Sequence, residues 1–205
     1  MPRKKGSVII PNRYRFIYNW AMQTTKIEIS ELKAPFDMTQ LRDMLLPLDT
    51  SFTTDMVYEV ECQTNAFKLV LRVLEVPLTK KYELDLDSSE KEWDRILLAK
   101  SGNDLCGYLA YSYKNWNRRL CIWHFYVARE HRKKGVGTIL VDHLKKTGQI
   151  IGAKNVWVES NNLNYPAIQM YQKLGFNLCG VDMSLYSGTE GESSEEVAVF
   201  LSSSV

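Results

Sequence analysis

A short basic loop with two glycines is the first stretch whose residue types could do chemistry. In REHRKKGVGTIL (129–140), three consecutive basic residues precede a Gly-x-Gly, and the sequence then becomes apolar. The residues concerned are Arg132, Lys133, Lys134, Gly135, Val136, Gly137 and Thr138. Glycines let main-chain amides approach a ligand closely, and the start of a helix presents unbonded N–H groups with a positive dipole. The segment therefore predicts a cradle for phosphate or pyrophosphate, with a purely structural turn as the alternative.

This loop matches neither of two common nucleotide-binding motifs. A Walker loop requires Gly-Lys-Ser/Thr after the glycines, which is absent here. A dinucleotide fingerprint requires a third glycine, where this chain has Leu140. The anion would therefore belong to another class of ligand.

A second stretch, NNLNYPAIQMYQKLGF (161–176), contains a tyrosine that could act as an acid. Pro166 stands near the start of a predicted helix, where its missing N–H costs nothing, and Gly175 ends that helix as a left-handed cap. Tyr171 lies on the apolar face of this helix. It is either a core side chain or a proton donor, because a phenol with a pKa of about 10 is protonated at neutral pH.

Strands and helices must hold these two stretches close together. LCIWHFYV (120–127) and VWVES (156–160) are typical of buried strands, and each leads into one of the two stretches. Residues 38–46 predict a helix capped by Thr39, and the acidic segment 83–94 predicts a mobile loop. The first half otherwise predicts antiparallel strands at 25–30, 56–62, 67–76, 95–100 and 105–113, the last two joined as a hairpin.

Composition and charge exclude several classes of protein. The 45% hydrophobic content suffices for a packed core, and the net charge of +2 is too small to favour a nucleic-acid partner. No apolar run reaches the roughly 18 residues that a membrane span requires. The four cysteines and three histidines lack the spacing of metal ligands. We therefore predict a cytoplasmic protein with reduced thiols and no metal site.

The amino-terminal segment, residues 1–24, is basic and has no acidic residue before Glu28. We expect a flexible tail there and a folded domain over residues 25–205. Contact with RNA or an anionic surface is one alternative for this tail. Another is that translation starts at Met22.

Together the two stretches resemble the signature motifs of the GNAT acyl-CoA N-acetyltransferases. Further segments, among them SFTTDMVYEV, WNRRL and GFNLCGVDMSLY, look like streptothricin (nourseothricin) acetyltransferases, over roughly residues 26–200. The resemblance implies an α/β (α+β) fold with a mixed, mostly antiparallel, twisted sheet that splays at a cofactor cleft and is flanked by helices. It also implies acetyl-CoA-dependent acetylation of a small-molecule amine, with antibiotic resistance as the outcome. The two motifs are Arg132-x-x-Gly135-x-Gly137 and Asn164-x-x-Ala167-x-x-x-Tyr171-x-x-x-Gly175-Phe176.

The same resemblance implies how acetyl-CoA would be held. The main chain of Phe125, Tyr126 and Val127 would bond the pantetheine arm, and residues 132–138 would hold the pyrophosphate. Asn164 would contact the cofactor from the second motif. Tyr171 would protonate the leaving thiolate, and an N–H near Val127 would stabilise the oxyanion.

The amine must lose a proton before it attacks, so an acceptor for that proton is required. Glu159 is the first candidate, as base or substrate ligand, and His124 is the second. Asp182 and Asp55 are weaker candidates for receiving a cationic substrate. The alternatives are a structural role for Glu159, a packed position on the strand for His124 and a turn position for Asp182.

One departure from the streptothricin branch concerns the site that would receive the acceptor amine. Relatives carry Ile-Glu-Asp/His-Ile on the strand before the loop, whereas this chain has Trp123 in place of the glutamate. An indole can hold a cation, worth about 0.5–2 kcal/mol, but cannot take a proton. Lys133 also replaces a glycine that is frequent in relatives. The sequence therefore leaves open a GNAT for a protein amine or polyamine, a non-catalytic acyl-CoA-binding module, and a homodimer.

Overall fold

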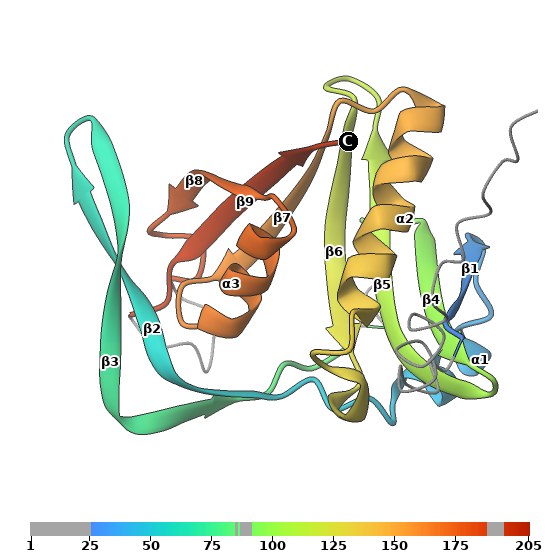
Figure 1. The fold of residues 1–205 in the computed structure, drawn as a ribbon. Coiled ribbons are helices and arrows are strands. Elements are labelled where there is room, and N and C mark those ends of the chain that lie inside the picture. Colours follow the sequence, from blue (N-terminus) through green and yellow to red (C-terminus); the bar gives the residue numbers. More distant parts are fainter. Residues whose placement is uncertain (1–25, 85, 87–91, 188–194) are drawn as a thin grey trace, which may run out of the picture.

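The computed structural model describes residues 26–84, 86, 92–187 and 195–205 (Figure 1). The predicted tail at 1–24 and the centre of the predicted loop at 83–94 lie outside these residues. Seven strands form one sheet in the order β1-β4-β5-β6-β7-β9-β8, and β2 pairs with β3 as a separate ribbon. The strands are β1 (Glu28–Lys33), β2 (Phe52–Gln63), β3 (Ala66–Lys80), β4 (Arg95–Ser101), β5 (Asp104–Lys114), β6 (Arg119–Val127), β7 (Asn155–Asn161), β8 (Asn177–Asp182) and β9 (Ala198–Ser204). The helices are α1 (Met38–Leu45), the 3-10 turn η1 (Arg129–His131), α2 (Val136–Ile151) and α3 (Tyr165–Lys173).

The sheet is antiparallel except between β6 and β7, which pair in parallel over only Arg119–Ile122 and Asn155–Val158. Beyond that point β6 stays bonded to β5, and β7 stays bonded to β9. Figure 1 shows the two strands diverging there. The predicted mixed, mostly antiparallel sheet with a splayed edge is confirmed.

A β-bulge lies where the two strands begin to separate. Ile122 is opposite Tyr111 and His124 is opposite Ala110, so the register shifts and Trp123 has no partner on β5. An extra residue of this kind bends a strand and turns its side chains to new directions. The bulge therefore sets how the second half of β6 faces the cleft.

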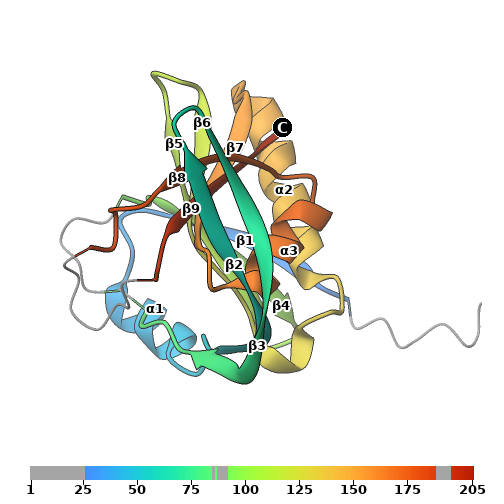
Figure 2. The same cartoon turned by 90° about the vertical axis from the view of Figure 1, so that its left-hand side faces the viewer.

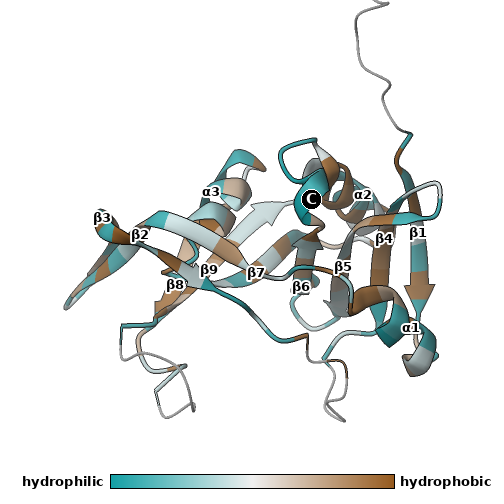
Figure 3. Cartoon of the chain, turned by 90° about the horizontal axis from the view of Figure 1, so that it is seen from below, coloured by the Kyte–Doolittle hydropathy of each residue, from teal (hydrophilic) through white to brown (hydrophobic). Residues whose placement is uncertain are grey.

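Helices cover both faces of the sheet. Figure 3 shows α2 and α3 on one side and α1 on the other. The α2 side chains Val136, Leu140 and Leu144 are buried in a core with β4, β5, β6 and β7. On the opposite face, Leu41 and Leu45 of α1 pack in a second core with β4 and β5. The helices therefore fix the strands from which the cleft is built.

Local chemistry explains where the helices begin and end. Gly135 and Gly152 flank α2 at φ values of 85° and 75°, which residues with side chains rarely adopt. The predicted left-handed cap at Gly175 is confirmed, with φ of 83°. The predicted Thr39 cap of α1 is wrong: Asp37 is the N-cap, and its carboxylate accepts from the Gln40 amide at 3.1 Å. Its side chain stands where the first unbonded amides of α1 need an acceptor.

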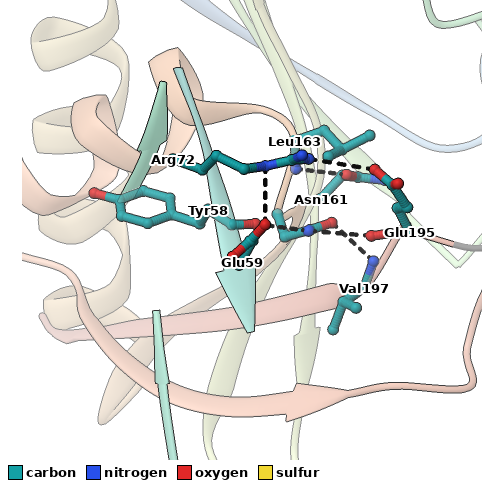
Figure 4. A network of polar contacts seen from close by, with 8 residues as sticks. Tyr58, Glu59, Arg72, Asn161, Leu163, Glu195 and Val197 are labelled. Atoms are coloured by element: carbon teal, nitrogen blue, oxygen red, sulfur yellow. Dashed lines mark hydrogen bonds and ion pairs between the residues drawn. The ribbon is translucent and has the colours of Figure 1, made fainter. Parts of the chain in front are cut away.

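The β2–β3 ribbon extends from the sheet and faces the viewer in Figure 2. Asn162, just after β7, holds it: its side-chain amide donates to Tyr58 O at 2.8 Å, and its main-chain O accepts from the Tyr58 amide at 3.0 Å. Arg72 of the ribbon also bonds Glu59 at 3.0 Å and Glu195 at 3.3 Å (Figure 4). These contacts join the base of the ribbon to the end of β7 and the segment before β9.

Candidate active site

A cavity of about 750 Å³ opens between the diverging halves of β6 and β7. It is lined by the end of β6, the loop before α2, the start of α3 and the end of β7. Three further segments close one side of it, contributing Thr50, Ser51, Phe52, Tyr82 and Tyr186. The two stretches singled out in the sequence therefore meet at one cavity.

The end of β6 presents main-chain groups to this cavity. Ala128 donates its amide N–H to Cys106 O of β5 at 2.9 Å. Because hydrogen-bonded and non-bonded pairs alternate along an antiparallel ladder, the Phe125 and Val127 main-chain groups face away from β5. On that side β7 has already diverged, so these amides are available to a ligand.

The loop between η1 and α2 has the geometry of an anion cradle. Lys133 and Gly135 both adopt positive φ, at 61° and 85°, and no side chain caps the α2 amino terminus. The first amides of α2 therefore point out of the helix, where its dipole favours an anion. A Cβ at Gly135 would meet nothing within 4 Å, so this glycine is required by its conformation rather than by space within the protein.

All the predicted cofactor residues except Lys134 line the cavity. The others are Phe125, Tyr126, Val127, Arg132, Lys133, Gly135, Val136, Gly137, Thr138, Asn164 and Tyr171. Asn164 is the N-cap of α3, and its side-chain oxygen accepts from the Ala167 amide at 3.2 Å. Lys134 is exposed and does not belong to the lining.

The Arg132 side chain is bonded to the protein main chain. Its Nε donates to Val127 O at 3.0 Å, its Nη1 to Ser51 O at 2.9 Å and its Nη2 to Asp49 O at 2.7 Å. The guanidinium therefore joins the end of β6 to the turn before β2. Sequence reasoning had assigned Arg132 to the pyrophosphate and had no signal for this turn.

Tyr171 is 6% exposed and faces the cavity from α3. Its ring packs between Phe125, at 6.1 Å between centroids, and Phe176, at 5.4 Å. No described residue is hydrogen-bonded to its hydroxyl. Burial raises the pKa of that hydroxyl well above the value for free tyrosine. The group is therefore a neutral donor, oriented by packing and open to a ligand.

Glu159 of β7 lines the opposite part of the cavity and is partly buried. Its carboxylate accepts a hydrogen bond from the Tyr186 hydroxyl at 2.7 Å. His124 also lines the cavity, and its ring lies edge-on to Trp93 at 6.0 Å. The structure therefore brings both predicted proton acceptors to the cavity that Tyr171 faces.

Trp123 has partners of its own although it borders the cavity. Its indole N–H donates to Ser112 Oγ at 2.9 Å, and the Lys114 ammonium lies 5.4 Å from the ring centroid. Lys114 also pairs with Glu92 at 3.4 Å. One cation of the protein thus already lies against this ring.

The two weaker acidic candidates do not line the cavity. Asp182 accepts from the amide and the hydroxyl of Ser184, both at 2.8 Å, and these bonds lower the pKa of its carboxyl. This is the geometry of a turn aspartate. Asp55 is exposed on the ribbon, where the β2–β3 register shifts.

Aromatic and hydroxyl side chains that sequence reasoning missed form the remaining wall. Phe52 stacks on Tyr82 with 6.0 Å between ring centroids, and Thr50 donates to Tyr82 O. These residues come from two distant segments without periodicity. The segments SFTTDMVYEV, which contains Phe52, and GFNLCGVDMSLY, which contains Tyr186, were the available signals.

In the described part of the chain, no three His, Cys, Asp or Glu side chains gather as a group that could hold a metal ion. Nor does any helix in those residues have the length and apolar character needed to cross a membrane.

Comparison with known proteins gives consistent matches. Residues 62–176 match the model of the acetyltransferase (GNAT) family. A streptothricin acetyltransferase of Streptomyces lavendulae is 36% identical over 163 residues, covering 76% of this chain and 85% of the relative. The crystal structure of a nourseothricin acetyltransferase has 35% identity and a TM-score of 0.73, over 87% of this chain and 98% of that one. A Bacillus anthracis structure in complex with acetyl coenzyme A has the same fold, with a TM-score of 0.71 at 23% identity over 88% of this chain and 100% of that one.

Proposed function

The chain belongs to the GNAT family of acetyltransferases, and from this premise we propose that it transfers the acetyl group of acetyl-CoA to a cationic amine of the streptothricin class. Such a transfer would inactivate the antibiotic. The observation that carries the proposal is the cavity itself, which places Tyr171 and the Glu159–Tyr186 pair along one opening between β6 and β7.

The residues at one end of the cavity fit an acyl-CoA. The amide N–H groups of Phe125 and Val127 suit the carbonyls of a pantetheine arm, although the Val127 carbonyl is already bonded to Arg132. The α2 amino terminus with Gly135 suits a pyrophosphate. The Bacillus anthracis protein with the same fold binds acetyl coenzyme A, which supports this assignment. When bound, acetyl-CoA supplies an activated acetyl thioester.

Side chains of the protein then transfer the two protons that the amine loses. Glu159 takes the proton of the incoming ammonium, and the Tyr186 hydrogen bond holds the carboxylate in place while it does so. The Val127 N–H stabilises negative charge on the acetyl oxygen. The carbon–nitrogen bond forms as the carbon–sulfur bond breaks, and Tyr171 gives its hydroxyl proton to the departing thiolate. The acylated nitrogen carries one proton more than the amide keeps, and this proton returns to Tyr171, so the phenol is neutral again at the end of the reaction.

The acceptor end favours a positively charged amine. Glu159 is the one carboxylate among the described lining residues, and several aromatic rings line the same cavity. Aromatic faces attract cations, by about 0.5–2 kcal/mol, without offering them a competing anion. These rings belong to Phe52, Tyr82, Trp123 and Tyr186. Streptothricin acetyltransferases such as the Streptomyces lavendulae relative support an antibiotic amine as the acceptor.

A thiol-release assay with acetyl-CoA and an amine panel tests the proposal. The panel contains streptothricin, a polyamine and a peptide with a free amino terminus. We expect turnover with streptothricin, a loss of about 10²–10⁴-fold in kcat/KM for Glu159→Gln, and unchanged acetyl-CoA affinity by calorimetry. Asp182→Asn is the matched control, because that carboxylate does not line the cavity. Turnover with peptides alone would refute the acceptor, and acetyl-CoA binding without any turnover would refute the enzyme.

A further inference from the structure

We propose that Arg132 is a positioning residue for the acceptor, and that its guanidinium transmits occupancy of the phosphate loop to the part of the cavity wall formed by Thr50, Phe52 and Tyr82. This inference rests on the proposed function for the identity of the acceptor. It concerns a task that is distinct from holding the pyrophosphate.

The first step is where the guanidinium donates. Of its five N–H groups, three are bonded to carbonyls, one at the end of β6 and two in the turn before β2. A guanidinium is a rigid planar fork, so acceptors on both sides fix its position and are fixed by it. Arg132 thus holds Val127 and the turn at Asp49–Ser51 at a set separation.

The second step is what this turn supports. The turn is closed by the Ser51 amide, which donates to Asp49 Oδ1 at 2.9 Å. Thr50 is 5% exposed and donates its hydroxyl to Tyr82 O. Phe52 follows directly and stacks on the Tyr82 ring. A continuous set of contacts therefore runs from Arg132 to the Phe52 and Tyr82 rings, which line the cavity.

The third step is the position of Arg132 in the phosphate loop. It directly precedes Lys133, which, like Gly135 two residues later, adopts a positive φ in this loop. Ordering of this loop by an anion restricts the Arg132 backbone, and through the guanidinium it restricts the turn. Acetyl-CoA should therefore improve acceptor binding, and the acceptor should improve acetyl-CoA binding by the same factor.

The test compares Arg132→Gln with Arg129→Gln, which removes the same charge from the same segment. Arg129 is 80% exposed and lies 3.9 Å from the Asp49 carboxylate. We measure acetyl-CoA affinity by calorimetry, KM for streptothricin at saturating acetyl-CoA, and amide hydrogen exchange of a peptide spanning residues 47–55 with and without acetyl-CoA. Thr50→Val is a second variant, which removes the hydroxyl that donates to Tyr82 O and leaves the Arg132 contacts in place.

For Arg132→Gln we expect acetyl-CoA affinity equal to that of Arg129→Gln, and a KM for streptothricin raised by about 5- to 150-fold. Acetyl-CoA should slow exchange at residues 50–52 in the parent and in Arg129→Gln, but not in Arg132→Gln. Thr50→Val should raise KM without changing acetyl-CoA affinity.

The opposite pattern would overturn the inference. In that pattern Arg132→Gln would bind acetyl-CoA more weakly than Arg129→Gln, while its KM for streptothricin and its amide hydrogen exchange would equal those of the parent. The guanidinium would then be a direct phosphate ligand. Absence of streptothricin turnover by the parent would instead refute the proposed function. The exchange measurement would still decide the role of Arg132, because it needs only acetyl-CoA.

Discussion

Replacing Tyr171 by phenylalanine removes one hydroxyl from the cavity and little else. The ring is 6% exposed and packed against Phe125 and Phe176, so phenylalanine retains those contacts. No hydrogen bond within the described residues is lost. We therefore expect unchanged acetyl-CoA affinity and unchanged or slightly higher stability. If the hydroxyl is the acid for the thiolate, kcat falls by about 10²–10⁴-fold, equivalent to about 2.7–5.4 kcal/mol of activation free energy.

Tyr108 provides the matched control for this substitution. It is 1% exposed, its hydroxyl is buried without a partner among the described residues, and it does not line the cavity. An unsatisfied buried hydroxyl costs about 1–3 kcal/mol. Tyr108→Phe should therefore keep parental kcat and raise Tm by about 2–4 °C per kcal/mol recovered.

The measurements are thiol release at saturating substrates, calorimetry with acetyl-CoA, and thermal unfolding of both variants. Because burial raises the Tyr171 pKa, the parental kcat should also show no alkaline decline up to a pH of about 10. Parental kcat in Tyr171→Phe would refute the reasoning, since the thiolate would then take its proton from water and Tyr171 would be a core residue. Equal losses in both variants would point to disturbed packing instead.

Three further predictions concern the loop, the bulge and alkaline stability. Gly135→Val should weaken acetyl-CoA binding measured by calorimetry, because φ of 85° is strained for a β-branched residue and the loop must then rearrange; unchanged affinity would contradict the cradle. Trp123→Glu should raise kcat/KM for streptothricin only when combined with Lys114→Met, because Lys114 lies 5.4 Å from the present ring and would pair with the new carboxylate; an equal gain in the single variant would show that Lys114 does not compete. Burial raises the pKa of Tyr126 to about 12. The folded chain therefore keeps a proton that the unfolded chain loses above a pH of about 10. The free energy of unfolding should be unaffected by this group below that pH and should decline as the pH rises toward 12. Urea unfolding at several pH values should show a smaller decline for Tyr126→Phe, and an equal decline would assign it to other groups.

The sequence allowed prediction of the elements at the proposed acetyl-CoA site, because their signals are local. Gly175 was predicted as a left-handed cap and is confirmed, whereas Gly135 was predicted only to open a helix and is found to adopt a left-handed backbone as well. The buried strand before the loop was also confirmed, as β6. Helix α1 shows the limit of such signals, since Asp37 and Thr39 are both acceptable caps and side-chain geometry decides between them.

The acceptor end was harder to predict because it depends on contacts between distant segments. Ser51, Tyr82 and Tyr186 meet only after the ribbon and the β8 turn have docked, and none of them carries a spacing that predicts it. Asp182 was a weaker candidate than Glu159, with a turn aspartate as its alternative, and the fold decides for that alternative because its carboxylate does not line the cavity. Strand β9 was not predicted either, although it positions Glu159 through its pairing with β7.

The short parallel ladder between β6 and β7 has a consequence for the life of the protein in a cell. Among the described residues it is the one direct strand pairing, over Arg119–Ile122, between the half of the sheet that carries β1, β4 and β5 and the half that carries β8 and β9. A ligand lying along the open part of this seam bridges the two halves and is lost when they separate. Acetyl-CoA at a hundredfold excess over its Kd would then add about 2.7 kcal/mol to the free energy of unfolding. Resistance to proteases should therefore rise and fall with the supply of acetyl-CoA.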